Sequence, residues 1–144
     1  MHRISLAAVS AAALLLFAAP SFAATIFVSN EKHNTITVLN GETLEIIKTV
    51  KVARRPRGIV VSPDGKELFV AAGDGDIMDV VDTKTLEVWR QLESGPDPEL
   101  MAIDPKGEII YIANEDDSLV TIMDIKSGDI LAEVPVASSP RAWA

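Results

Sequence analysis

Oxygen-rich side chains recur at equivalent places after apolar segments of this sequence. Asp74 and Asp76 flank a glycine, and Asp116 and Asp117 follow Glu115. Carboxylate oxygens are the ligands that a hard cation such as Ca²⁺ prefers. The spacing is not that of an EF-hand loop, which needs ligands at alternate positions, a central glycine and a final glutamate. Two interpretations stay open, a weak cation site at these four aspartates or polar turns that join strands.

Nucleophilic catalysis has few candidate residues. The sequence contains no cysteine. His33 is the one histidine after the first few residues, and it lies between Lys32 and Asn34 in an expected turn. A catalytic triad or a histidine-rich metal site cannot be assembled from one such histidine. We therefore predict no catalytic residue and no cofactor bound by this chain.

Two further groups of residues allow a functional and a structural interpretation. Arg54, Arg55 and Arg57 form a local basic patch, whereas the matching segment one repeat later, Ser94–Glu99, carries carboxylates. The patch predicts either a solvated loop between repeats or a contact for an anion. Trp89 aligns with two aliphatic residues, which predicts a core residue of an outer strand.

The elements that position these side chains follow a repeat of 42 residues. Such a period decides the fold before any motif does. Chance similarity rarely keeps one spacing across independent positions. The residues that define the repeat are the aromatic residues Phe27, Phe69 and Tyr111, the prolines Pro56 and Pro98, and the glycines Gly65 and Gly107.

The middle unit predicts four strands, at Gly58–Ser62, Glu67–Ala72, Ile77–Asp82 and Leu86–Leu92. They contain β-branched and aromatic residues, and turn residues such as Ser62-Pro63-Asp64-Gly65 separate them. Asp82 is expected to cap the turn that follows it. Four strands in a unit of this length indicate an all-β protein of β-propeller blades with four antiparallel strands, incomplete at under three blades.

The predicted domains are a signal peptide and a partial propeller. Residues 1–23 comprise a basic start, an apolar run and small residues at Ser21 and Ala23, which predicts cleavage after Ala23 and no stable membrane span afterwards. We expect the product in the periplasm or secreted. The formal net charge of −8 argues against nucleic-acid binding.

Residues 24–144 divide into blades of approximately 24–51, 52–93 and 94–135, with the start of a fourth at 136–144. The first blade lacks the strand that Gly58–Ser62 supplies in the second. The last residues match the repeat mainly through Pro140, and a one-base deletion in GC-rich codons would explain the divergence. A frameshift that truncated a longer propeller and an in-frame end both stay open. Open strand edges predict self-association.

The aromatic strands resemble the tyrosine-valine-threonine-asparagine (YVTN) repeats of β-propellers. Phe27-Val28-Ser29-Asn30 and Tyr111-Ile112-Ala113-Asn114 match best, whereas Ala72-Gly73 departs from the usual pair. The N-terminal segment, Ala24–Lys32 and Ser94–Glu99 further resemble the periplasmic propellers associated with pyrroloquinoline quinone (PQQ)-dependent alcohol catabolism. That resemblance implies a full propeller of about seven blades.

The resemblance also implies a function, that of a non-catalytic binding or accessory protein in PQQ-dependent alcohol oxidation. PQQ would reach the chain only through a partner, either a periplasmic quinoprotein dehydrogenase or its electron carrier. The alternatives are a propeller enzyme, lactonase-like or itself a quinoprotein, and a truncated product without independent function. The tryptophan-rich blade motifs of quinoprotein dehydrogenases are absent from the sequence.

Overall fold

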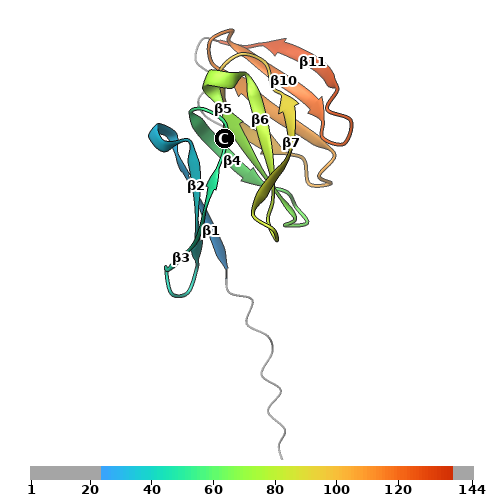
Figure 1. Ribbon diagram of the computed structural model, residues 1–144. Helices are drawn as coiled ribbons and strands as arrows, with labels where there is room; N and C mark the ends of the chain where they lie inside the picture. The colour runs from blue at the N-terminus through green and yellow to red at the C-terminus, as the bar shows by residue number, and fades with distance from the viewer. Residues whose placement is uncertain (1–23, 138–144) are drawn as a thin grey trace, which may run out of the picture.

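The computed structural model describes residues 24–137 as three antiparallel sheets in chain order (Figure 1). The first sheet has the strand order β1-β2-β3, the second β4-β5-β6-β7, and the third β8-β9-β10-β11 with β8 and β11 at its edges. This confirms an all-β fold of propeller blades, incomplete at under three. The predicted signal peptide and most of the predicted fourth blade lie outside the described residues.

The strands are six or seven residues long, as expected for a repeat of this size. Their bounds are β1 Thr25–Asn30, β2 Thr35–Asn40, β3 Ile46–Lys51, β4 Pro56–Val61, β5 Glu67–Ala72, β6 Ile77–Asp82, β7 Glu87–Glu93, β8 Pro98–Ile103, β9 Ile109–Asn114, β10 Leu119–Asp124 and β11 Ile130–Pro135. Two 3₁₀ turns, Glu31–His33 and Gly73–Gly75, follow β1 and β5. Strand β4 begins two residues before the predicted Gly58, because Pro56 already pairs with Ala72.

Side-chain caps close the turns at one end of the sheets. The Asp82 Oδ1 atom accepts hydrogen bonds from the backbone N–H groups of Lys84 and Thr85, at 2.9 and 2.7 Å, as the sequence predicts. These backbone hydrogen bonds, that of Thr85 foremost, lower the pKa of Asp82. Asn40 and Asp124 cap the equivalent turns. One type of turn therefore joins the third strand to the fourth in each unit.

Two apolar cores lie between consecutive sheets. One joins the first sheet to the second and is built from Ile36, Val38, Val50, Val52, Leu68, Val70 and Val81. The other joins the second sheet to the third and is built from Phe69, Ala71, Met78, Val80, Leu92, Met101, Ile110, Ile112, Met123 and Ile125. The middle sheet is thus buried on both faces, and each outer sheet on one.

The prediction that Trp89 is a core residue is wrong. Its side chain is 55% exposed, and the aligned residues Ile47 and Leu131 are exposed as well. In the second sheet Val80 pairs with Arg90 and Val81 with Val88, which leaves Trp89 as the extra residue of a β-bulge. Since a bulge re-aims its side chains, the residue leaves the core side of the sheet.

The same bulge interrupts β3 and β11, at the positions where Ile47 and Leu131 stand. The outermost strand of each sheet therefore carries an exposed apolar residue at the position of this bulge. Within residues 24–137 the structure contains no helix that is long and apolar enough to cross a membrane.

Candidate functional site

The segments that lead from one sheet to the next gather at the end of the sheets opposite the capped turns. Asn34, in the left-handed conformation, accepts a hydrogen bond at its Oδ1 atom from the backbone N–H of Arg55, at 2.9 Å. One repeat later Asp76, also left-handed, accepts one from the backbone N–H of Asp97, at 3.2 Å. Each connection is therefore fixed, through its own backbone N–H, to a side chain of the preceding sheet, in the turn between β1 and β2 or the turn between β5 and β6.

A second, buried anchor differs between the two connections. In the third sheet, Asn114 donates from Nδ2 to the carbonyl oxygens of Ser94 and Pro96, at 2.9 and 3.0 Å, and accepts from the Thr121 hydroxyl at 2.8 Å. In the second sheet, alanine replaces this asparagine at position 72. Alanine cannot make these hydrogen bonds, so another residue has to hold the connection into β4.

Asp79 supplies the compensation. It stands one repeat before Thr121, it is buried, and its Oδ2 atom accepts a hydrogen bond from the backbone N–H of Ala53, at 2.6 Å. Its Oδ1 atom accepts another from Gln91 Nε2, at 2.7 Å. Sequence reasoning missed this residue, although an aspartate in line with two threonines, beside an alanine in line with two asparagines, was a usable signal.

Residues of opposite charge at the same place in consecutive repeats form ion pairs. Arg55 Nη1 lies 3.0 Å from Asp97 Oδ1, and the Arg57 guanidinium contacts the Glu99 carboxylate. Asp97 and Glu99 are both buried. Of the two interpretations of the basic patch, neither describes these two arginines, because they bind carboxylates of the next repeat. The exposed Arg54 instead pairs with Asp74, at 3.1 Å.

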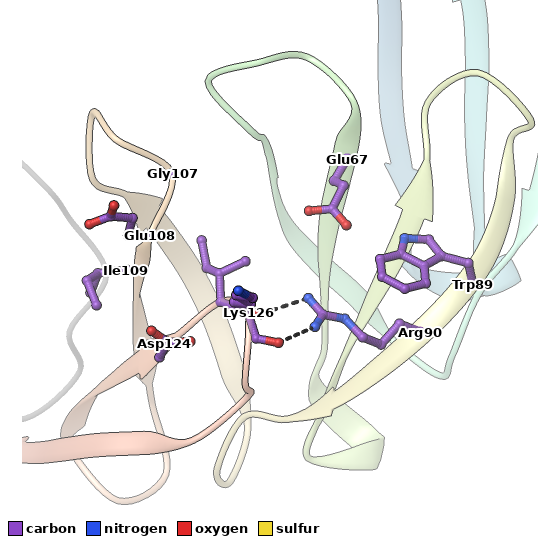
Figure 2. Close-up of a pocket in the computed structure, with 9 residues that line it drawn as sticks. Glu67, Trp89, Arg90, Gly107, Glu108, Ile109, Asp124 and Lys126 are labelled. Carbon is purple, nitrogen blue, oxygen red and sulfur yellow. Dashed lines mark hydrogen bonds between the residues drawn. The ribbon is translucent and has the colours of Figure 1, made fainter.

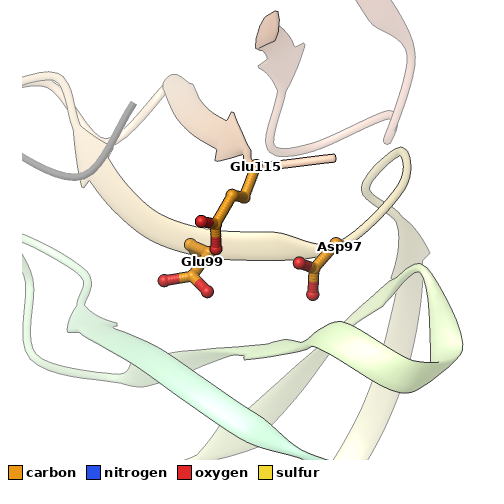
Figure 3. A group of neighbouring side chains, drawn as sticks. All are labelled: Asp97, Glu99 and Glu115. Atoms are coloured by element: carbon orange, nitrogen blue, oxygen red, sulfur yellow. The ribbon is translucent and has the colours of Figure 1, made fainter. Parts of the chain in front are cut away.

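Three carboxylates come together here, as Figure 3 shows, and two of them contact these arginines. One oxygen from each of Asp97, Glu99 and Glu115 lies within 4.8 Å of the others. Burial and a hydrogen bond with Glu115 raise the pKa of Glu99, and the charge of Arg57 opposes that rise only in part. The cluster could offer three oxygens to a hard cation. Two arginines already contact its oxygens and supply positive charge there.

The four aspartates proposed from the sequence as weak metal ligands lie elsewhere. Asp74 pairs with Arg54 and Asp76 binds a backbone N–H, whereas Asp116 and Asp117 are exposed in the turn before β10. Within residues 24–137, the carboxylates that lie close enough together to share a metal ion are those of Asp97, Glu99 and Glu115 instead. The signal for it was the alternation of arginine and carboxylate across one repeat, which becomes informative once adjacent repeats are known to touch.

A groove lies between the second and third sheets at the end with the capped turns (Figure 2). It encloses about 600 Å³. Its charged lining residues come from both sheets and include Glu67, Arg90, Glu108, Asp124 and Lys126. The guanidinium of Arg90 crosses the groove and donates to the carbonyl oxygens of Ile125 and Lys126, at 2.8 and 3.1 Å.

The indole of Trp89 lies beside this guanidinium, with the Arg90 Cζ atom 5.0 Å from the ring centroid. Such a distance permits a cation–π interaction. Because Arg90 already binds two carbonyl oxygens of the third sheet, we interpret it as a residue that joins the two sheets.

Solved structures share this fold. Hydrazine synthase of Kuenenia stuttgartiensis superposes with a TM-score of 0.76 at 24% identity, over 81% of this chain and 34% of that chain. A dihydro-heme d1 dehydrogenase, NirN, in complex with DHE gives a TM-score of 0.67 at 20% identity, over 81% of this chain and 26% of that chain. Apo AztD from Citrobacter koseri gives 0.63 at 17% identity, over 76% and 31%.

The chain thus spans about a third or less of the length of these structures, with 34%, 26% and 31% covered. At such identities the likeness establishes the fold and leaves the activity open. No curated protein matches the sequence. The model of one family, the YNCE-like β-propeller, matches residues 3–142. The chain therefore belongs to the YNCE-like β-propeller family.

Proposed function

We propose that this chain is a non-catalytic, exported propeller that serves as a binding or accessory protein in PQQ-dependent alcohol oxidation. The observation that carries the binding role is the charged end of the sheets, where Glu31, Arg54 and Asp74 are exposed above a buried ion-pair layer. Arg55 of this layer also contacts Glu31 and Asp74, at 3.4 and 3.6 Å, so we expect these side chains to form a well-ordered polar surface. A rigid surface loses little entropy when a partner binds.

The resemblance to periplasmic propellers of alcohol catabolism supports the choice of partner. The partner would be a quinoprotein dehydrogenase or its electron carrier, and it would hold the PQQ. The segment before Ala24 supports export to the periplasm or beyond. Mass spectrometry of the exported chain should find a mature N-terminus at Ala24.

A binding measurement tests the role. The purified chain is immobilised, and a PQQ-dependent alcohol dehydrogenase and its electron carrier from the same cell are passed over it at increasing salt. We expect binding that weakens with salt, because exposed charges are screened. Arg54→Glu should weaken binding at least tenfold. Lys106→Glu, an equal charge reversal at the opposite end of the sheets, should leave it unchanged.

A second candidate is a propeller enzyme of the lactonase or quinoprotein type. The cluster of Asp97, Glu99 and Glu115 is the feature that favours it, because a metal-assisted enzyme of this kind would need oxygen ligands for a hard cation. The arginines bound to the same carboxylates weigh against a cation there. Turnover of alcohols or lactones with added PQQ and Ca²⁺ would favour the enzyme. If the chain shows no turnover and binds no partner, a product without independent function would be favoured.

A further inference from the structure

The first sheet exposes apolar side chains whose counterparts in the next sheets are buried. Ile26 and Val28 of β1 are 38% and 43% exposed. One repeat later, Leu68 and Val70 of β5 are buried. The residues are alike in size and polarity, so the difference comes from the neighbouring sheet that covers β5. We call the side of the first sheet that carries Ile26, Val28 and Leu39 the head face.

The third sheet exposes apolar side chains on its other face, the one that corresponds to the face of the second sheet covered by the third. Val134 of β11 is 43% exposed, whereas Leu92, one repeat earlier, is buried. Ile122 of β10 is half-buried, whereas Val80, one repeat earlier, is fully buried. We call the side of the third sheet that carries Tyr111, Val120, Ile122 and Val134 the tail face.

Inside the molecule, side chains at head positions pack on side chains at tail positions. Leu68 and Val70 of the second sheet share a core with Ile36 and Val38 of the first. One repeat later the pattern is the same, and the residues of that core include Phe69, Met78 and Val80 of the second sheet with Ile110, Ile112 and Met123 of the third. The head and tail faces therefore have the complementarity of an interface that the chain forms twice within itself.

We propose that copies of this chain associate head to tail, with the head face of one copy packed on the tail face of the next. The occupant of each face is a second copy because the internal interfaces already pair these repeat positions. The contact is heterologous, so it closes into a ring if the rotation between copies permits and otherwise extends into an open chain. It uses sheet faces, in contrast to pairing through the open edge of β1.

Sedimentation velocity over a range of concentrations tests the proposal, with one variant for each face. Val28→Lys blocks the head, and Ile122→Lys blocks the tail, because a buried lysine without a partner is costly. The unaltered chain should assemble. Each variant alone should be monomeric, with self-association weakened at least tenfold, while an equal mixture should form a heterodimer through the one intact head and the one intact tail.

Trp89→Lys is the matched control, since it replaces an exposed apolar residue of the middle sheet and should assemble like the unaltered chain. Ile26→Lys and Val134→Lys provide a second pair if circular dichroism shows that a first variant has not folded. A monomeric unaltered chain would overturn the proposal. So would variants that still assemble alone, which would indicate edge pairing or a symmetric contact, or a mixture that stays monomeric.

Discussion

The connections into β4 and β8 occupy the same place in the repeat and are held by different chemistry. The first carries Arg55 and Arg57 and is anchored by the buried Asp79 carboxylate. The second carries Asp97 and Glu99 and is anchored by the Asn114 amide. The difference shows that the repeat preserves the positions of the backbone hydrogen bonds, while the donor and acceptor side chains vary between units.

The charges of the two connections also depend on each other. Arginines in one connection contact carboxylates at the equivalent positions of the other. Their positive charge offsets the cost of burying those carboxylates. Substitutions that remove one member of a pair, or exchange one anchor for the other, separate these contributions.

The largest effect is expected from Arg57→Ala. It leaves the buried Glu99 carboxylate without its cation, which should cost about 3 kcal/mol of unfolding free energy. Arg54→Ala is the matched control, because its partner Asp74 is exposed and such a pair contributes about 1 kcal/mol or less. Urea denaturation at a fixed protein concentration measures both. Equal losses would show that burial does not distinguish the two pairs.

Asn114→Ala should lower the free energy of unfolding by about 2 kcal/mol, because it leaves the buried carbonyl of Ser94 without its donor. Asn30→Ala, at the same repeat position in the first sheet, should cost less, because that amide binds two part-buried threonine hydroxyls. The same denaturation measurement compares the two. A larger loss at Asn30 would contradict the assigned role of Asn114.

Exchange of the anchors sharpens the comparison. Asp79→Thr should destabilise the chain by about 1–2 kcal/mol, since the Ala53 N–H loses its acceptor. The double variant Ala72→Asn with Asp79→Thr installs the pair found in the third sheet and should recover part of the loss. No recovery would mean that the backbone of the two connections differs too much for one anchor to serve both.

Gly58→Ala should cost about 1–3 kcal/mol, because close-packed backbone has to move. A Cβ atom at Gly58 would lie 2.3 Å from the carbonyl oxygen of Glu99, where β4 passes β8. Leu100→Ala at the equivalent position should cost less. Thermal melting monitored by circular dichroism can compare the two variants, and an unchanged melting temperature for Gly58→Ala would contradict the close approach.

The smallest effect is a pH dependence at Glu99. Its pKa is raised in the folded chain, mainly by burial and by Glu115. A carboxyl whose folded pKa exceeds its unfolded pKa stabilises most below the unfolded value, and that contribution is lost as pH rises through the folded value. Stability of the unaltered chain should therefore decline relative to Glu99→Gln as pH increases from about 4. Parallel curves for the two proteins would contradict this.

The sequence by itself determined the repeat, the all-β architecture and the turn chemistry. Proline, glycine and aspartate act on the backbone next to them, so a cap such as that of Asp82 can be predicted from local spacing. The strands at Glu67–Ala72 and Ile77–Asp82 also follow from local pattern, and they have the predicted bounds.

Tertiary structure decided which of these residues are buried and which charges meet. Ile26 and Leu68 are equivalent in the repeat, yet only the second is covered, because burial depends on the neighbouring sheet. Trp89 left the predicted core because a bulge turned it outward. The cluster of Asp97, Glu99 and Glu115 forms only when β8 and the end of β9 lie side by side. The spacing of residues along the chain does not reveal that contact.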